Sequence, residues 1–199
     1  MGFLSQVGAM KRRQFVVLDR DGTIIVDRDY LSDPSQIEFL PGAVRGLRLL
    51  LEMGLGLVVL TNQSAIGRGF FDEAQLDLVH RRLRELLKAG GVQLEGIYFC
   101  PHTPEDGCSC RKPKVGLIER AANELDFDVQ ASFVIGDKAA DIEMGRRVGA
   151  TTFLVRTGYG AEFVNDPTVN ADYVADDLWI TAQMIQRIVG TSGENKVDP

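Results

Sequence analysis

The chain lacks the long apolar stretches that anchor proteins in membranes. Among its 199 residues there is no uninterrupted apolar run of about 18 residues, the length typical of a membrane-spanning helix. Residues 1–10 are only mildly apolar and lack the central apolar region of a secretory signal, although Lys11, Arg12 and Arg13 follow them. We therefore expect a cytoplasmic protein with no membrane partner.

Basic charge is also scarce. The chain has 22 Lys and Arg against 28 Asp and Glu, a formal net charge of -6, and no long basic block. The field of the whole chain does not favour nucleic acid, so any phosphate group has to be bound locally.

Cysteine is rarer still, with three residues that all fall between positions 100 and 110. An odd, clustered set does not build a disulfide framework across a fold. The hydrophobic share of 45% suffices for the core of one globular domain. We expect that domain at residues 14–190, between an N-terminal extension (1–13) and a flexible tail (191–199).

Short apolar runs alternate with segments of helical periodicity. The runs predict strands at residues 15–18, 55–60, 96–99, 132–135, 151–155 and 173–175. Apolar residues at three-and-four spacing predict helices at residues 43–53, 72–89, 115–125, 139–148 and 178–189. The alternation is typical of an α/β fold, a parallel sheet covered by helices on both faces.

Carboxylates follow two of the predicted strands. Asp19 and Asp21 come directly after the first strand, and they point the same way if the chain remains extended. Taken alone, this pattern is as often an Asp-Gly turn with solvated acids. Asp137 follows the strand at 132–135, and Asp141 lies one helical turn later. Clustered carboxylates repel one another unless a cation relieves them, and oxygen ligands favour magnesium.

Other polar residues are expected at the same edge, because ligands of open parallel sheets bind beyond the carboxyl ends of the strands. Thr61 and Asn62 follow the strand at 55–60, and Arg111 and Lys112 precede a predicted helix. A carboxylate beside magnesium can attack a phosphoryl group, while a second acid moves the protons. Donors and cations then stabilise the phosphoryl oxygens. The loop at 27–40 is unusually long, which often indicates a functional loop.

The segment at 100–110 holds every cysteine and one of only two histidines. Cys100, His102, Cys108 and Cys110 supply four ligands, the number that a closed tetrahedral zinc site takes. The alternative is three free core cysteines, but a polar loop rich in proline and glycine is a poor core. We therefore predict a structural zinc that anchors the adjoining Arg-Lys pair. His80, in a basic helical stretch, is predicted to be a surface residue.

The motifs occur in a defined order along the chain: Asp19-Arg20-Asp21-Gly22-Thr23, Thr61-Asn62-Gln63-Ser64, Cys100-x-His102, Cys108-x-Cys110-Arg111-Lys112-Pro113 and Gly136-Asp137-Lys138. In this order the chain resembles the haloacid dehalogenase superfamily of phosphatases, over about residues 14–185. Within it, the match is to the zinc-containing branch of D-glycero-D-manno-heptose 1,7-bisphosphate 7-phosphatases and histidinol-phosphate phosphatases. The resemblance implies a Rossmann-like three-layer αβα sandwich with a mainly parallel sheet and no large cap domain.

The resemblance also implies roles for the matching positions. Asp19 would be the nucleophile and Asp21 the general acid and base. Thr61 and Lys112 would hold the transferring phosphoryl group, and Arg111 would help to recognise the substrate.

Metal and substrate positions follow in the same way. Magnesium would be bound by Asp19, Asp137 and the backbone carbonyl of Asp21, with Asp141 beside them. The expected substrate-binding residues lie in the loops around the site and are Asp27, Arg28, Asp29, Tyr30, Thr61, Asn62, Gln63, Ser64, Arg111, Lys112 and Lys138.

The implied activity is that of a monomeric, magnesium-dependent phosphatase of a small sugar bisphosphate. The stretch at 61–69 looks like that of the heptose enzymes. Lys138 does so too, whereas histidinol phosphatases commonly carry Arg at the position of Lys138. We therefore expect hydrolysis of the 7-phosphate of heptose 1,7-bisphosphate through an aspartyl-phosphate, toward the heptoses of surface polysaccharide. Histidinol phosphate or another small sugar phosphate is the alternative substrate, and a non-catalytic zinc-binding module is the alternative of another class.

Ala65 departs from the heptose pattern, which usually has Gly at this position. If the position requires positive φ, alanine strains the loop. The sequence leaves the preferred anomer of the substrate open.

Overall fold

One parallel sheet forms the centre of the molecule. The computed structural model describes residues 13–194, with side chains to residue 190. Six strands lie in the order β3-β2-β1-β4-β5-β6, and every neighbouring pair is parallel. The strands are β1 (Phe15–Leu18), β2 (Gly56–Asn62), β3 (Gly96–Cys100), β4 (Phe133–Gly136), β5 (Thr151–Val155) and β6 (Tyr173–Ala175).

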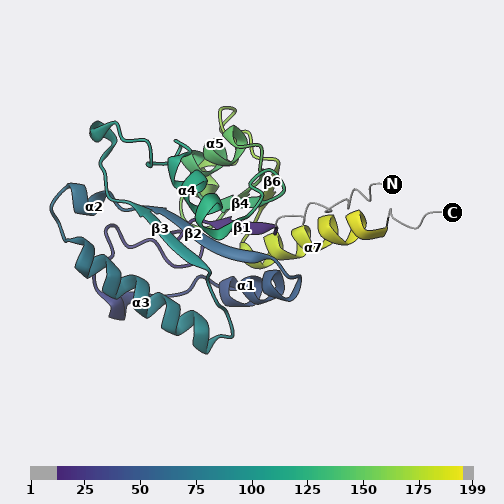
Figure 1. The fold of residues 1–199 in the computed structure, drawn as a ribbon, viewed down its shortest axis with the longest axis horizontal. Coiled ribbons are helices and arrows are strands. Elements are labelled where there is room, and N and C mark those ends of the chain that lie inside the picture. The colour runs from purple at the N-terminus through teal and green to yellow at the C-terminus, as the bar shows by residue number, and fades with distance from the viewer. Residues whose placement is uncertain (1–12, 195–199) are drawn as a thin grey trace, which may run out of the picture.

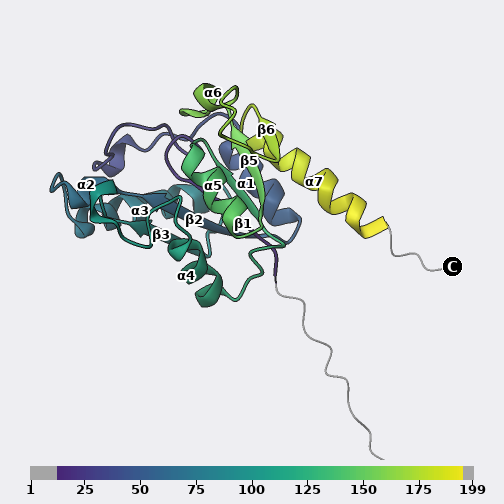
Figure 2. The same cartoon turned by 90° about the horizontal axis from the view of Figure 1, so that it is seen from above.

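Helices cover both faces of this sheet (Figures 1 and 2). One face carries α1 (Ala43–Glu52), α3 (Glu73–Ala89) and α7 (Leu178–Glu194), and the other carries α4 (Gly116–Leu125) and α5 (Ala139–Arg147). The connections contain the short α2 (Ser64–Gly67) and α6 (Gly160–Phe163) and the 3-10 helices η1 (Pro34–Gln36) and η2 (Pro104–Asp106). The predicted three-layer sandwich is confirmed, and within residues 13–194 no large cap domain is attached to it.

The central strand shows why its sequence is a continuous apolar run. Val16 and Leu18 pack into the core under α1, α3 and α7, whereas Phe15 and Val17 pack into the core under α4 and α5. Side chains of a strand alternate between its two faces, and here both faces are covered. The sheet therefore holds the carboxyl end of β1 rigidly inside the molecule.

The second strand is longer than predicted. Thr61 and Asn62, expected after the strand, belong to β2 and pair with Phe99 and Cys100 of β3. Polar side chains end an apolar pattern, but the backbone ladder continues beneath them. Single-turn helices such as α2 and α6 are too short for a periodic pattern. Helix α7 continues to Glu194, past residue 191 where we predict a tail, and residues 1–12 and 195–199 lie outside the described residues.

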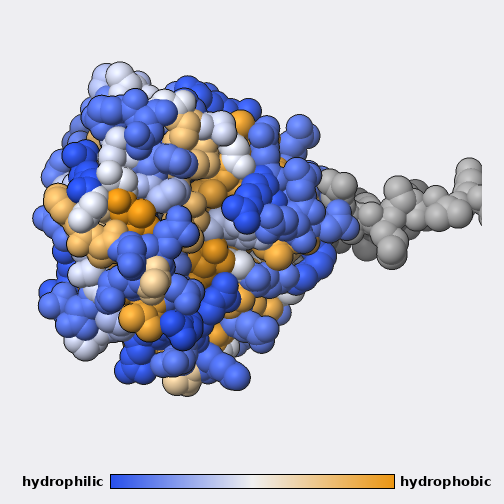
Figure 3. Space-filling model, turned by 60° about the vertical axis from the view of Figure 1, so that its left-hand side comes forward, coloured by the Kyte–Doolittle hydropathy of each residue, from blue (hydrophilic) through white to orange (hydrophobic). Residues whose placement is uncertain are grey.

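Polar residues dominate the face that Figure 3 presents, and apolar residues appear there in small groups. No helix within residues 13–194 has the length and apolar character needed to cross a membrane.

Candidate active site

Three buried carboxylates meet at the carboxyl edge of the sheet. Asp19 follows β1, Asp137 follows β4, and Asp141 lies in the first turn of α5. One oxygen of each lies within 4.8 Å of the others. Burial and the neighbouring Asp19 raise the pKa of Asp137 to about 8. Its Oδ1 has no hydrogen-bond partner among the described residues. A buried, unpartnered carboxylate oxygen beside two more acids fits a divalent cation.

Two glycines bring the backbone close to Asp137. A Cβ atom on Gly22 or on Gly158 would lie 2.2 Å from Asp137 Oδ2. Both glycines have positive φ, 80° and 56°, which other residues adopt only with strain. The same oxygen accepts a 2.9 Å hydrogen bond from the backbone N–H of Tyr159. Gly22 of the first motif and the loop after β5 therefore form the walls around this carboxylate.

Lys112 supplies the positive charge of the cluster. Its Nζ lies 2.7 Å from Asp19 Oδ1, 2.6 Å from Asp141 Oδ1 and 2.7 Å from the carbonyl oxygen of Leu60. Burial opposes the charged form, but Asp141 and Asp19 outweigh it and raise the pKa of Lys112 to about 12. The ammonium group is therefore permanently charged beside the carboxylate of Asp19.

The side chain of Asn62 holds Lys112 in place by hydrogen bonds to the backbone of Lys112. Its Oδ1 accepts a hydrogen bond from the N–H of Lys112 at 3.1 Å, and its Nδ2 donates to the carbonyl of Lys112 at 3.2 Å. The last residue of β2 thus fixes a lysine 50 positions later in the chain. This contact explains why a strand end and a distant loop contribute to one site.

Asp21, in contrast, faces the opening of the site. Arg20 Nε donates to both of its carboxylate oxygens at 3.1 and 3.0 Å, and Gln63 Nε2 donates to Oδ2 at 3.0 Å. Gln63 also donates to Thr61 Oγ1 at 2.8 Å. These hydrogen bonds fix the carboxylate of Asp21. Asp21 lies two residues from Asp19 but takes no part in the ion pair between Asp19 and Lys112.

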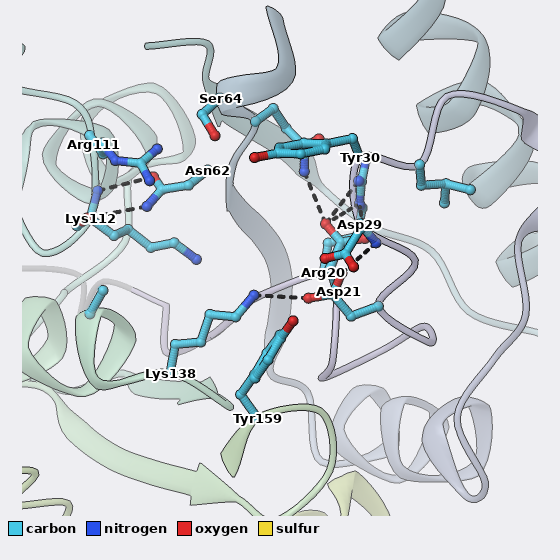
Figure 4. Close-up of a pocket in the computed structure, with 14 residues that line it drawn as sticks. Arg20, Asp21, Asp29, Tyr30, Asn62, Ser64, Arg111, Lys112, Lys138 and Tyr159 are labelled. Carbon is cyan, nitrogen blue, oxygen red and sulfur yellow. Dashed lines mark hydrogen bonds and ion pairs between the residues drawn. The ribbon is translucent and has the colours of Figure 1, made fainter. Parts of the chain in front are cut away.

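An open cleft of about 290 Å³ lies above these groups (Figure 4). Tyr30 lies across the cleft from Lys138 and Tyr159 (Figure 4). Lys138 Nζ binds Asp27 Oδ2 at 3.0 Å, and although burial opposes its charge, Asp19, Asp137 and Asp27 raise its pKa. The residues that line the cleft are Arg20, Asp21, Asp27, Asp29, Tyr30, Leu31, Asn62, Gln63, Ser64, Arg111, Lys112, Lys138, Ala140 and Tyr159.

The four predicted zinc ligands also converge. The Sγ atoms of Cys100, Cys108 and Cys110 lie 3.1 to 3.6 Å apart, and His102 Nδ1 lies 3.5 Å from Cys100 Sγ and 3.3 Å from Cys110 Sγ. All three thiols are free. Zinc–sulfur bonds of about 2.3 Å place tetrahedral ligands roughly 3.5–4 Å apart. The residues therefore fit a closed tetrahedral zinc site.

This cysteine cluster adjoins the cleft through Arg111. Arg111 Nη1 donates to the carbonyl oxygen of His102 at 3.1 Å, and its side chain lines the cleft. Lys114 Nζ braces the same loop by donating to the carbonyls of Gly107 and Cys108 at 2.7 and 2.6 Å. A metal at the cluster would fix the loop that carries Arg111 and Lys112.

Comparison with known proteins agrees with this geometry. The HAD-hydrolase-like family model matches residues 109–180. The D-glycero-beta-D-manno-heptose-1,7-bisphosphate 7-phosphatase of Pseudomonas aeruginosa is 36% identical over 174 residues, which cover 87% of this chain and 98% of the relative. The enzyme of the same name from Escherichia coli K12 is 39% identical over 181 residues, covering 86% and 93%. The chain belongs to this phosphatase family.

A solved structure extends the agreement to three dimensions. The D,D-heptose 1,7-bisphosphate phosphatase of B. bronchiseptica, complexed with magnesium and phosphate, superposes with a TM-score of 0.82 at 31% identity. The match covers 88% of this chain and 99% of that one. The chain is accordingly a haloacid dehalogenase-type hydrolase of phosphoric monoesters, as its motifs predict.

One sequence prediction at the site needs correction, and one stays a prediction. His80 is buried in α3 and lies 3.1 Å from Arg20 Nη1, so the prediction of a surface residue is wrong. The arginines around His80 in the sequence indicated an exposed segment. In the helix, however, His80 continues the buried face formed by Leu76 and Val79. Arg28 forms an exposed ion pair with Glu38 and is not among the residues that line the cleft, so its role in substrate binding stays a prediction.

The sequence did not predict two further features of the site, one at Ala65 and one at Gly158 and Tyr159. Ala65 lies in α2, and its φ is not positive, so alanine causes no strain there. Gly158 and Tyr159 complete the walls of the site, and neither was among the predicted site residues. Their signal was a turn-forming Gly-Tyr-Gly that begins three residues after the predicted strand at 151–155, on the edge where the other strand ends meet.

Proposed function

We propose that this phosphatase removes the 7-phosphate of D-glycero-D-manno-heptose 1,7-bisphosphate and that it requires magnesium. The observation that carries the proposal is the buried Asp19–Lys112 ion pair at the base of a polar cleft, in a chain that spans 98% of a relative with this activity in its name. The polar lining, with Lys138 and Arg111 as cations, suits a small phosphorylated sugar.

The magnesium ligands in this proposal are Asp19, Asp137 and the backbone carbonyl of Asp21. The unpartnered Oδ1 of Asp137 supports the assignment, because a cation would satisfy it. When bound, the ion neutralises charge on the phosphoryl oxygens. Asp141 forms an ion pair with Lys112 and accepts a hydrogen bond from the N–H of Lys138, so it orients both residues.

The chemistry proceeds in two displacements. A carboxylate oxygen of Asp19 attacks phosphorus, the bond from phosphorus to the sugar oxygen breaks, and Asp21 gives that oxygen its proton. Water then attacks the aspartyl-phosphate while Asp21 takes a proton from it, releasing inorganic phosphate and regenerating Asp19. Lys112 and Thr61 stabilise the negative oxygens of the transferring group.

The rest of the cleft is assigned to substrate recognition. The cleft is lined by Asp27, Asp29 and Tyr30 on the loop after β1 and by Asn62, Gln63 and Ser64 at and just after the end of β2, so we place the sugar between them and Lys138. Arg28 is left out, because its side chain turns toward Glu38.

A structural zinc at Cys100, His102, Cys108 and Cys110 completes the proposal. With four protein ligands and no open position, the ion holds the loop and takes no part in the reaction. We further propose that residues 14–190 act as a single domain, monomeric and cytoplasmic. Light scattering of the eluting peak in size-exclusion chromatography tests the monomer.

Steady-state kinetics with magnesium test the activity. We expect the highest kcat/KM for one anomer of heptose 1,7-bisphosphate, a lower value for histidinol phosphate, and loss of turnover with a magnesium chelator. A clear preference for histidinol phosphate would overturn the substrate assignment. Absence of phosphate release from every sugar phosphate would favour a non-catalytic zinc-binding module.

A further inference from the structure

A buried arginine lies directly under the cleft, and the proposed reaction gives it no part. Arg20 is the residue between Asp19 and Asp21, and its side chain is 1% exposed. A guanidinium group taken out of water needs partners for its donors. Arg20 has two such partners, Asp21 and His80.

The contact with Asp21 fixes the orientation of that carboxylate. Arg20 Nη2 lies 2.8 Å from Asp21 Oδ2, and Nε donates to both oxygens. Several donors in one rigid plane restrict a carboxylate more than a single hydrogen bond does. Gln63 adds a further donor from the end of β2.

The contact with His80 fixes the arginine in turn. His80 Nε2 lies 3.1 Å from Arg20 Nη1. A guanidinium can only donate, so His80 accepts through Nε2 and carries its proton on Nδ1. Burial and the charge of Arg20 lower the pKa of His80 to about 3, which keeps the imidazole neutral and able to accept.

His80 belongs to a rigid part of the fold. It shares the buried face of α3 with Val79 and Leu83, and its ring centroid lies 5.9 Å from that of Phe99 in β3. Side chains on packed helices hold their geometry better than side chains on loops. A continuous chain of contacts therefore runs from α3 through Arg20 to the carboxylate at the cleft.

From this geometry we propose that His80 and Arg20 are positioning residues, which hold the carboxylate of Asp21 where it can protonate the leaving oxygen of the substrate. This inference rests on the proposed function, because it takes Asp21 as the general acid. Neither residue touches the substrate in this role. His80 acts only through Arg20, and Arg20 only through Asp21.

The dependence on the leaving group separates positioning from general damage. The value of kcat/KM reports the steps through phosphoryl transfer to Asp19. A sugar alkoxide needs a proton as it leaves, whereas 4-nitrophenolate is a weak base and leaves without one. A misplaced Asp21 therefore slows hydrolysis of heptose bisphosphate but spares 4-nitrophenyl phosphate.

The test compares His80→Leu with His80→Gln on both substrates. Leucine removes the acceptor, so we expect kcat/KM for heptose bisphosphate to fall by on the order of tenfold. The value of kcat/KM for 4-nitrophenyl phosphate should change by less than about threefold. Glutamine offers an acceptor oxygen near the place of Nε2, so it should restore heptose bisphosphate hydrolysis to within about twofold of the wild type. Leu83→Ala, on the same buried face, is the control for lost packing, and it should lower Tm without separating the two substrates.

Arg20→Lys provides a second test if His80→Leu does not fold. It keeps the charge but loses the planar pair of donors, so the same selective loss is expected. Equal losses on both substrates, or no rescue by glutamine, would overturn the positioning role. A wild-type enzyme that hydrolyses 4-nitrophenyl phosphate but no heptose bisphosphate would instead contradict the proposed function, and another alkyl phosphate that it hydrolyses would then take the place of the sugar in the comparison.

Discussion

The base of the cleft and its rim are built in different ways. The base, which we define as Asp19, Lys112, Asp137 and Asp141, has buried side chains from three segments of the chain, and Lys112 forms short ion pairs with Asp19 and Asp141. The rim, defined as Asp27, Asp29, Tyr30, Ser64, Arg111 and Tyr159, lies on loops and short helices. Tyr30 is 47% and Tyr159 39% exposed.

The difference assigns different tasks to the two regions. Reacting groups need a geometry fixed to a fraction of an ångström, which the sheet edge provides. Groups that only select a substrate can lie on loops, which vary without disturbing the core. We therefore expect changes in the base to lower kcat and changes in the rim to raise KM.

The largest effect is expected for Asp19→Asn. The amide cannot attack phosphorus, and we expect kcat to fall by at least about 10⁴-fold, measured as phosphate release. Asp29→Asn is the matched control in the rim, and its kcat should stay near that of the wild type. Turnover of Asp19→Asn above about a tenth of the wild-type value would exclude Asp19 as the nucleophile.

Lys112→Met should have the next largest effect. The change leaves Asp19 and Asp141 buried without their counter-ion, so kcat should fall by about 10³-fold, and the free energy of unfolding by about 3 kcal/mol. Phosphate release and urea denaturation measure the two quantities. Lys88→Met, an exposed lysine at the end of α3, should change neither. A variant with normal kcat would place Lys112 outside the machinery.

Loss of Cys108, a proposed zinc ligand, should have a smaller effect that falls on the rim. In Cys108→Ser we expect less bound zinc and, because Arg111 loses its anchored loop, a KM raised by about tenfold with kcat changed less than about threefold. Metal analysis and steady-state kinetics give both values. Ser109→Ala, the neighbouring residue outside the cluster, should bind about one zinc per chain. Active wild-type protein without zinc would refute the structural role.

The smallest effects separate Tyr30 from Arg28, two residues earlier in the loop after β1. Tyr30→Ala removes a wall of the cleft, so KM should rise by about fivefold with little change in kcat. Arg28→Ala should leave both constants within about twofold, because an exposed ion pair with Glu38 contributes little. The reverse order of effects would mean that Arg28 turns into the cleft when substrate binds.

The sequence predicts the base better than the rim, for a physical reason. Asp19 and Asp137 directly follow β1 and β4, and parallel strands bring their carboxyl ends to one edge. The four predicted zinc ligands share one short segment, so their spacing already indicates their contact. The fold follows from the same local patterns, because each element is long enough to show its period.

Contacts between distant segments could not be predicted from these patterns. Nothing near His80 in the sequence indicates that it faces Arg20, 60 positions away. Gly158 approaches Asp137 only because β4 and β5 are neighbours in the sheet. The orientation of Arg28 depends on Glu38 across the loop, which motif position alone does not show.

The most direct test of the account is rapid acid quenching of wild-type enzyme during turnover of heptose bisphosphate, followed by peptide mass spectrometry. We predict that the peptide containing Asp19 gains the mass of one phosphoryl group and that fragmentation places the group on Asp19. Phosphate release without any phosphorylated peptide, or with the phosphoryl group on another residue, would contradict the assignment of Asp19 at the base of the cleft as the nucleophile.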